Sequence, residues 1–433
     1  MNSEDRSINV GLLGLGVVGS GVFKALDQQS TLITQQLGCS VRIAGILVKD
    51  LNKVRDITVA NDLLTTDPYS LLEDQHIHII VEAMGGEKPA LDYLRRALET
   101  GKSVVTANKE VMAKHGPELL LLANKNGARI LFEASVGGGI PILGPLTKDL
   151  RGNNIEAIRA IINGTTNYIL TKMTYDNMEF AQALEEAQNL GYAESDPTND
   201  VDGIDAGYKI AILASLGFQT KVAAQDVYIE GISRLTARDF RYATELGYVI
   251  KLVAIAKSNG DQLEIRVHPA LIPQETPLAK IDGVLNAVEI EGDLVGKVLF
   301  QGQGAGSMPT TSAIIGNVLE VASNIISKLP IKDFVPLDKE KDLKSIADLS
   351  TRYYIRTTVS DRAGVLAQMA TILGNLQISI ASVIQKEVDP NDQTAELVIT
   401  THISRESDVQ EAMKELEKLD VVREIGNFLR VEE

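Results

Sequence analysis

The first third of the chain alternates short apolar runs with longer segments whose apolar residues recur every three or four positions. Such runs are typical of buried strands, and such segments are typical of helices. We therefore expect strands at 8–13, 41–48, 78–84, 102–108 and 128–134, and helices at 89–100 and 110–126. This alternation predicts an α/β fold with a Rossmann-type doubly wound parallel sheet, covered by helices on both faces.

The last eighty or so residues follow a different pattern, after a charged stretch at 329–350 that lacks clear periodicity and is predicted to be a linker. The expected strands are 353–359, 378–385, 395–401 and 421–429, and the expected helices are 364–373 and 404–416. The order of these elements is that of a ferredoxin-like βαββαβ unit.

A glycine-rich turn, Gly14-x-Gly16-x-x-Gly19, follows the first strand and leads directly into a helix. In a dinucleotide fold these glycines make the tight turn, admit a pyrophosphate and let helix and strand pack closely. The unpaired N–H groups of the helix N-terminus then face the anion. We predict a dinucleotide site whose contacts include Gly14, Leu15, Gly16, Val17, Val18 and Gly19.

Cofactor preference depends on the end of the second strand, where Lys49 precedes Asp50. A lysine facing the ribose would accept a 2′-phosphate and favour NADP, whereas an aspartate would favour NAD. Both residues can also be solvated charges. We favour NADP(H), with NAD(H) as the alternative. Gly85, Thr106 and Lys109 stand at strand ends that should line the crevice at the carboxyl edge of the sheet.

Two glycine-containing segments lie in the middle of the chain. The segment FEASVGGGIPI (132–142) fits a hinge between domains or a loop whose carbonyls hold a hard cation, and its residues alone favour the hinge. The segment AIINGTTNYIL (160–170) predicts a strand, an Asn-Gly turn and a helix start capped by threonine. The free N–H groups of this helix start could receive a carboxylate or a carboxamide.

The stretch AESDPTNDVDGIDAGYK (193–209) contains five carboxylates and one lysine. A calcium loop aligned on Gly203 would place Thr198 at its first position and Lys209 at its twelfth, where a bidentate glutamate is needed. A calcium loop is therefore excluded. Asp196 and Asp202 precede proline and glycine and are predicted to shape turns.

Asp205 and Lys209 are four residues apart on an otherwise apolar predicted helix, so they share one of its faces. They form either a satisfied buried salt bridge or an acid and an amine that line a cleft. A nicotinamide enzyme must move a proton to or from the oxygen of its substrate, and a desolvated lysine suits that task. Carboxylates beside such a lysine favour a cationic, amino-acid-like substrate.

Composition narrows the functional classes. A net charge of −16 disfavours nucleic acid and anionic membranes as partners. No apolar run is long enough to span a membrane, and the polar N-terminus does not resemble a secretory signal. The single cysteine, Cys39, rules out an intrachain disulfide and fits a cytoplasmic location.

Six motifs occur in the same order in homoserine dehydrogenases: GLGVVGSG, VVTANKE, FEASVGGGIPI, NGTTNYIL, GYAESDPTNDVDGIDAGYK and GQGAGSMPT. The chain resembles that family over about residues 8–325. The resemblance implies reduction of L-aspartate 4-semialdehyde to L-homoserine with NADPH or NADH, in threonine, methionine and isoleucine biosynthesis. No aspartokinase-like region precedes the motifs, so a monofunctional enzyme is expected, acting as a homodimer or homotetramer.

The resemblance also implies roles for individual residues. Lys209 and Lys109 match the catalytic lysines, with Lys209 the usual choice for proton transfer. The positions that match substrate contacts are Glu194, Asp205, Gly191 and Asp200. Glu133, Val136, Gly138 and Ile140 match a site for sodium or potassium that uses mostly backbone carbonyls, which replaces the hinge interpretation. Gly304, in the loop GQGAG, matches a cofactor contact.

The C-terminal segment VSDRAGVLAQMATILGNLQISIASV resembles an ACT domain, a module that binds amino acids and usually pairs with another copy. The resemblance implies L-threonine as a feedback inhibitor; the alternative is a dimerisation module without a ligand. Asp361, Gly364, Val365 and Leu366 would form the ligand edge, with Asn375 and Ile378 near the pairing interface.

The expected domains are a dinucleotide-binding domain at 1–135 and about 305–328, a central α+β catalytic and dimerisation domain at 136–304, the linker, and the ACT domain at 351–433. An amino-acid-sensing regulatory protein with an inactive dehydrogenase domain is an alternative, although the intact lysines and carboxylates disfavour it. An aspartate-semialdehyde dehydrogenase is excluded because it needs a cysteine nucleophile, and Cys39 stands at the start of the second strand, away from the crevice.

Overall fold

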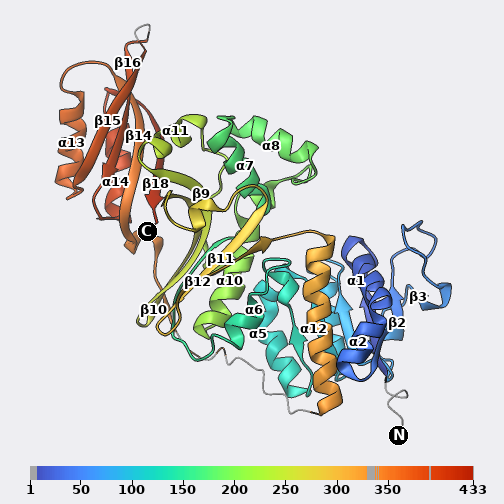
Figure 1. The fold of residues 1–433 in the computed structure, drawn as a ribbon. Coiled ribbons are helices and arrows are strands. Elements are labelled where there is room, and N and C mark those ends of the chain that lie inside the picture. The colour runs from blue at the N-terminus through green and yellow to red at the C-terminus, as the bar shows by residue number, and fades with distance from the viewer. Residues whose placement is uncertain (1–6, 329–336, 338, 340, 390–391, 433) are drawn as a thin grey trace. The chain divides into compact units, whose positions relative to one another are not determined.

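The computed structural model describes residues 7–328, 337, 339, 341–389 and 392–432, so residues 329–336, 338 and 340 of the predicted linker lie outside the described residues. The chain forms two compact units (Figure 1). The first contains Met1–Ile155, Tyr208–Gln225 and Asn286–Glu340, and the second contains Glu156–Gly207, Asp226–Leu285 and Lys341–Glu433. Within the described part, no helix has the length and apolar character needed to cross a membrane.

The first unit is built on a parallel sheet in the order β3-β2-β1-β4-β5-β6. Its strands are β1 (Ser7–Leu13), β2 (Ser40–Leu47), β3 (Leu64–Thr65), β4 (Ile79–Glu82), β5 (Ser103–Thr106) and β6 (Ile130–Leu131). The prediction of a Rossmann-type sheet is confirmed, with the strand order reversing between β1 and β4. The strand expected at 128–134 is shorter than predicted, because Glu133–Ser135 form a 3₁₀ turn, η3.

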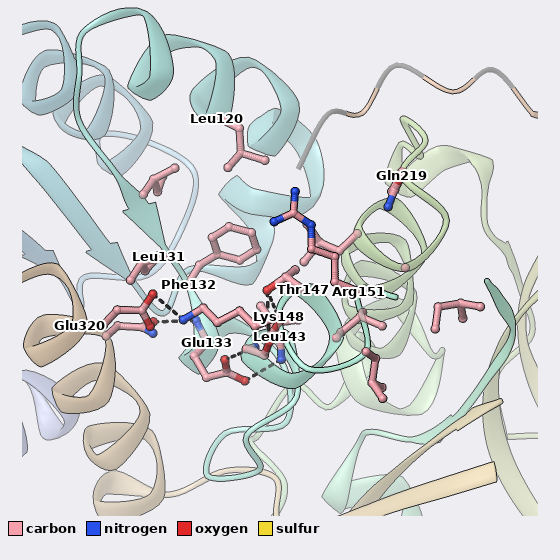
Figure 2. Close-up of a pocket in the computed structure, with 18 of the residues that line it drawn as sticks. Leu120, Leu131, Phe132, Glu133, Leu143, Thr147, Lys148, Arg151, Gln219 and Glu320 are labelled. Atoms are coloured by element: carbon pink, nitrogen blue, oxygen red, sulfur yellow. Dashed lines mark hydrogen bonds and ion pairs between the residues drawn. The ribbon is translucent and has the colours of Figure 1, made fainter. Parts of the chain in front are cut away.

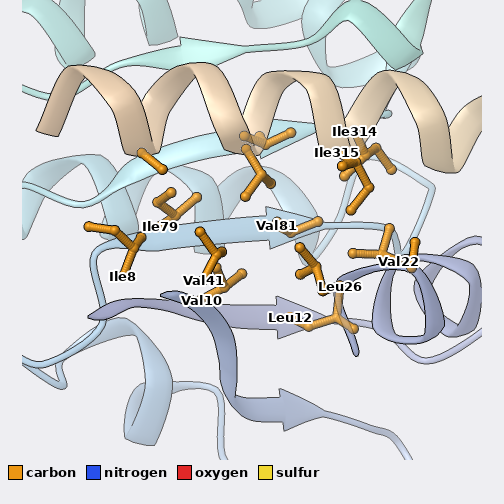
Figure 3. Packing of buried hydrophobic residues seen from close by; sticks show 14 of the residues in the cluster. Ile8, Val10, Leu12, Val22, Leu26, Val41, Ile79, Val81, Ile314 and Ile315 are labelled. Atoms are coloured by element: carbon orange, nitrogen blue, oxygen red, sulfur yellow. The ribbon is translucent and has the colours of Figure 1, made fainter. Parts of the chain in front are cut away.

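Three helices share an apolar core with the sheet: α1 (Val17–Gln28), α2 (Ser30–Leu37) and α12 (Ser307–Ser327). Figure 3 shows α12 above the strands, with Ile314 and Ile315 directed at side chains of β1 and β4. Because α12 also contacts α1, a segment from far along the chain completes this layer. Helices α4 (Ala90–Glu99) and α5 (Lys109–Lys125) contact each other, and α4 packs on β4 and β5.

The first unit also contains two short helices and two eight-residue strands. They are α3 (Tyr69–Leu72), α6 (Leu143–Thr147) and the neighbouring strands β11 (Leu285–Gly292) and β12 (Gly296–Gln303). Helix α10 (Ile204–Phe218) begins in the second unit and continues into the first from Tyr208 onward.

The second unit contains a sheet in which β7, β9 and β10 are neighbours. These strands are β7 (Ile155–Ile161), β9 (Tyr248–Asn259) and β10 (Gln262–Pro273), and β9 pairs antiparallel with both others. The accompanying helices are α7 (Gly164–Tyr175), α8 (Phe180–Asn189), α9 (Thr198–Val201) and α11 (Ala237–Glu245). Helix α7 packs against α8 and β9, and its first turn follows the end of β7 along the chain.

The C-terminal part of the second unit confirms the predicted βαββαβ order. Its elements are β14 (Ser350–Ser360), α13 (Val365–Asn375), β15 (Ile380–Asp389), β16 (Thr394–Thr401), α14 (Glu406–Glu417) and β18 (Val422–Val431). The strands lie in the order β18-β14-β16-β15, and α13 contacts α14. Strand β18 also pairs with β10, at Ala270↔Arg430 and Leu271↔Val431, so the sheet continues into the rest of the unit.

Candidate active site

The loop between β1 and α1 is shaped by its three glycines. Gly14 has a φ of +100°, and its N–H donates to the carbonyl of Leu47 at 3.0 Å. A Cβ on Gly19 would lie 2.1 Å from the Gly14 oxygen, whereas a Cβ on Gly16 would have no heavy atom within 4 Å. Gly16 is the N-cap of α1, and no side chain caps this helix. The turn, the close packing and the open approach of a dinucleotide loop therefore fall on the predicted residues.

Gly19→Ala is expected to lower the affinity for NADPH at least about tenfold and to destabilise the first unit, because the new methyl overlaps the Gly14 backbone oxygen. Gly16→Ala should lower the affinity by a similar factor but leave the free energy of unfolding unchanged, because its Cβ meets only open space. Titration calorimetry with NADPH and urea unfolding measure the two effects.

Gly152→Ala is the control for both variants, because its Cβ also has no neighbour within 4 Å and it lies outside the loop. Its NADPH affinity and its stability should match those of the unmodified chain. Wild-type affinity in Gly16→Ala would mean that this loop does not receive the pyrophosphate.

Glu82 organises the crevice between the ends of β4 and β5, although the sequence did not single it out. Its carboxylate is completely buried. One oxygen accepts the N–H groups of Met84 (2.7 Å) and Gly85 (3.2 Å), and the other accepts the Thr106 hydroxyl at 2.5 Å. Glu82 therefore fixes the ends of β4 and β5, where Gly85 and Thr106 are predicted to line the crevice.

Asn108 completes this edge and positions Lys109. Its Oδ1 accepts the Val111 N–H at 3.1 Å, which caps α5, and its Nδ2 donates to the Gly86 carbonyl at 2.7 Å. Lys109 is the first residue of α5 and follows directly.

Charged residues follow β2, where the ribose contact is predicted. Lys49 and Asp50 are both exposed. The Asp50 Oδ1 accepts the Asn52 N–H at 2.8 Å, so this carboxylate shapes its own turn. The Arg55 guanidinium donates to the Asp50 carbonyl at 2.6 Å and adds a second cation to the same loop.

The predicted cation loop, residues 133–140, is distinguished by its carbonyls. The Glu133 carboxylate accepts the N–H groups of Ile142, Leu143 and Gly144 at 2.5–2.7 Å, so it caps α6. Among the described residues, no amide donates to the carbonyls of Val136, Gly138 or Ile140, and no group of three or more His, Cys, Asp or Glu side chains could hold a metal.

This loop packs against the loop that contains Gly304. The Gly139 N–H donates to the Gln303 carbonyl at 3.1 Å. A Cβ on Gly138 would lie 2.5 Å from the Gly304 oxygen, and a Cβ on Gly304 would lie 1.8 Å from Asn286 Nδ2. Only glycines allow the two loops this contact.

The carboxylate-rich stretch converges on the first turn of α7. Asn163 Nδ2 donates to Asp200 Oδ1 at 2.7 Å and to Asp205 Oδ2 at 2.9 Å. The Asn163 Oδ1 accepts the Thr166 N–H at 2.9 Å, so asparagine caps this helix and the predicted threonine cap is wrong. The structure thus brings Asp200 and Asp205 together on one amide.

The other residues of this stretch are more open. Asp196 accepts the hydroxyl and the N–H of Thr198, which confirms its turn-forming role, and these hydrogen bonds lower the pKa of its carboxyl. Glu194 and Gly191 are exposed, and the Glu194 carbonyl accepts Gln188 Nε2 at 3.1 Å. Glu194 is therefore accessible to a ligand.

Helix α10 carries the acid and the amine. Asp205 is 4% exposed and Lys209 is 8% exposed, in a helix whose other buried residues are apolar apart from Ser215. The spacing of four places both on one face of the helix. Burial of two ionisable groups is costly unless they are paired or functional.

The predicted effector residues lie at the two ends of α13. Gly364 is its N-cap, with a φ of +87°, and Leu366 is 42% exposed. Asp361 and Asn375 are exposed, whereas the side chains of Val365 and Ile378 pack in the core of this βαββαβ unit.

A cavity of about 400 Å³ lies among α5, β6, α6 and α12. Figure 2 shows Lys148 reaching Glu320, at 2.5 Å, beside Glu133, with Arg151 and Gln219 farther along the wall. Of the predicted site residues, Glu133 alone is among those that line the cavity. None of the predicted substrate carboxylates and lysines is among the residues that line it.

Three family models match consecutive parts of the chain. Residues 14–133 match the family model "Homoserine dehydrogenase, NAD binding domain", residues 141–319 match "Homoserine dehydrogenase", and residues 353–421 match "ACT domain". Homoserine dehydrogenase of Bacillus subtilis is 41% identical over 427 residues, which cover 99% of each chain.

Two solved structures bear on the fold and the cofactor. The crystal structure of a homoserine dehydrogenase from Thiobacillus denitrificans has a TM-score of 0.93, with 40% identity and 99% coverage of each chain. A hyperthermophilic archaeal homoserine dehydrogenase in complex with NADPH has a TM-score of 0.63 and 29% identity, covering 75% of this chain and 99% of the other.

Proposed function

The chain belongs to the homoserine dehydrogenase family, and we propose that it interconverts L-homoserine and L-aspartate 4-semialdehyde with NADP(H), or with NAD(H). The observation that carries the proposal is the burial of Asp205 and Lys209 on one face of α10. The reaction needs one group that binds an ammonium and one that moves a proton, and this pair supplies both.

The residues divide the work between substrate binding and proton transfer. Asp205, Asp200 and Glu194 accept hydrogen bonds from the substrate ammonium and hydroxyl groups. Lys209 takes the hydroxyl proton when L-homoserine is oxidised and returns it in the reverse direction, with Lys109 as the second amine. A bound nicotinamide dinucleotide supplies the hydride acceptor.

The loop after β2 supports the preference for NADP. Asp50 is engaged in its own turn, while Lys49 is exposed and Arg55 adds positive charge nearby. Two cations suit a 2′-phosphate better than a free ribose hydroxyl. The similar archaeal structure that holds NADPH agrees with this preference.

The carbonyls of Val136, Gly138 and Ile140 would hold a sodium or potassium ion, because no described amide donates to them. Carbonyl oxygens are hard, uncharged ligands that suit such ions. With its carboxylate occupied by α6, Glu133 would contribute through its carbonyl or shape the loop. The bound ion would stabilise the contact between the loop at residues 133–140 and the loop that contains Gly304.

The ACT domain supports regulation by a small molecule, for which we propose L-threonine and feedback inhibition. The exposed edge formed by Asp361, Gly364 and Leu366 is the proposed binding position. Because ACT domains usually pair, we also propose a homodimer or homotetramer that works in threonine, methionine and isoleucine biosynthesis.

Purified protein with L-homoserine and NADP is expected to form reduced cofactor, followed by its absorbance, faster than with NAD. L-threonine should inhibit this turnover. Folded protein that binds NADPH but shows no turnover with either cofactor would contradict the proposal and favour a regulatory protein with an inactive dehydrogenase domain.

The Leu366→Asp variant separates the two parts of the proposal. It places a charge at the exposed start of α13, far in sequence from every predicted catalytic residue. It should keep basal turnover and lose inhibition by L-threonine. Unchanged inhibition would place the effector elsewhere.

A further inference from the structure

In a single orientation, the side-chain amide of Asn163 makes all four of the hydrogen bonds that it can make, two as acceptor and two as donor. It is 5% exposed and lies between β7 and α7. Its Oδ1 accepts the N–H and the hydroxyl of Thr166, both at 2.9 Å, which fixes the amide orientation. Its two Nδ2 hydrogens then face Asp200 and Asp205, at 2.7 and 2.9 Å. A flipped amide would place an oxygen against two carboxylates and lose the cap.

The first turn of α7 also holds the other predicted substrate segment. The Thr165 hydroxyl donates to the Tyr192 carbonyl at 2.7 Å. The Tyr192 ring packs against Tyr168 of the same helix, with ring centroids 5.0 Å apart. The segment that contains Gly191 and Glu194 is thereby attached to the turn that holds Asp200 and Asp205.

We propose that Asn163 is a positioning residue that holds the Asp200 and Asp205 carboxylates together, so that both face the substrate ammonium. Two carboxylates near each other repel, and a neutral group that donates to both offsets this repulsion. Asn163 acts through these aspartates. The inference rests on the proposed function, since it assumes that they bind the substrate.

Asn163→Ser is the main test, because serine keeps the helix cap and removes the double donor. We expect KM for L-homoserine to rise about ten- to hundredfold, since hydrogen bonds to charged groups are lost. KM for NADP should change less than about twofold, because the loop at Gly14–Gly19 is untouched. Asn163→Asp keeps the cap and the shape but adds a third carboxylate, so it should raise KM for L-homoserine further.

Asn154→Ser is the matched control, because Asn154 Nδ2 donates to Asp293 at 2.8 Å on the exposed surface. It should leave both KM values unchanged. Asn163→Asp serves as the second test if Asn163→Ser fails to fold, because it keeps the helix cap, replaces the double donor and should still raise KM for L-homoserine.

Wild-type turnover is measured first. No oxidation of L-homoserine by the unmodified chain would overturn the proposed function, and this inference with it. Wild-type turnover together with an unchanged KM for L-homoserine in folded Asn163→Ser would overturn the positioning role alone. Equal rises in KM for L-homoserine and NADP would also overturn it, because they indicate a general structural defect.

Discussion

Lys209→Ala is expected to lower kcat for L-homoserine oxidation about 10²- to 10⁴-fold, the usual contribution of a positioned general acid or base. Lys209 is 8% exposed on α10, so water cannot readily replace its amine. The dissociation constant for NADPH should change little, because the loop at Gly14–Gly19 is unaltered. Stopped-flow and steady-state kinetics give kcat, and titration calorimetry gives the affinity.

Three further variants make this prediction specific. Lys209→Arg keeps the positive charge but cannot give up a proton near neutral pH, so its kcat should stay low. Added alkylamines should partly restore the rate of Lys209→Ala and leave Lys209→Arg unchanged. Lys221→Ala, an exposed lysine just beyond α10, should behave as wild type.

Lys109→Ala distinguishes the two amines. If Lys209 moves the proton, amine rescue should occur in Lys209→Ala and be much weaker in Lys109→Ala. The reverse pattern would exchange the two roles. An equal loss of kcat and NADPH affinity in folded Lys209→Ala would contradict the proposed role of Lys209 in proton transfer.

Periodicity and glycine spacing were sufficient to predict the parallel sheet and the βαββαβ unit. In both, each residue's local preference agrees with its place in the fold. The loop at Gly14 could be predicted for a related reason. Its chemistry is backbone chemistry, and only glycine fits a Cβ position 2.1 Å from a carbonyl oxygen.

The residues that hold the site together could not be predicted in this way. In the sequence, Glu82 lies inside the strand predicted at 78–84, and only the structure shows Met84, Gly85 and Thr106 around its carboxylate. Asn163 reads as part of an Asn-Gly turn, because nothing in the local sequence points to carboxylates 37 and 42 residues away. Long-range hydrogen bonds leave no periodic pattern in the sequence.

Arg430→Met is expected to lower the free energy of unfolding of the second unit by about 3–5 kcal/mol, the usual cost of breaking a buried ion pair by removing one partner. Arg430 is 1% exposed and Glu406 is completely buried. The Arg430 guanidinium donates to both Glu406 oxygens, at 2.6 and 2.8 Å, and to both Glu230 oxygens, at 2.9 and 3.0 Å. Methionine would fill the space but leave both carboxylates without their cation.

The measurement must isolate the second unit, because a chain with two compact units can unfold in more than one step. The chain has no tryptophan, so urea unfolding is followed by circular dichroism. Hydrogen exchange in peptides from α14 and β18 locates the effect. The control is Arg405→Met, since Arg405 pairs with Asp348 on the surface, with side chains 56% and 46% exposed. Its cost should be about 0–1 kcal/mol.

The pH dependence tests the cause of this loss. Burial would raise the pKa of the Glu230 carboxyl, but the hydrogen bonds and charge of Arg430 outweigh it and hold the pKa below its usual value. This contribution to wild-type stability is present above the ordinary glutamate pKa of about 4.3 and is lost as the pH falls through the folded value. In Arg430→Met the Glu230 carboxyl loses the hydrogen bonds and charge of Arg430, so burial raises its pKa relative to wild type and acid relieves the destabilisation.

The difference in stability between wild type and Arg430→Met should therefore narrow as the pH falls from 7 toward 5. Adding Glu230→Gln and Glu406→Gln to Arg430→Met should recover part of the loss at pH 7, because neutral amides cost less to bury than unpaired carboxylates. A loss of stability that is independent of pH and is not recovered by these amides would mean that the loss comes from packing around Arg430.

The ion cluster of Arg430, Glu230 and Glu406 joins β18 and α14 to the segment that contains Glu230. The Ile232 N–H of that segment donates to the Val201 carbonyl, one residue from Asp200. The same ion cluster that stabilises the C-terminal domain thus supports helix α9, which carries the proposed substrate carboxylate of Asp200.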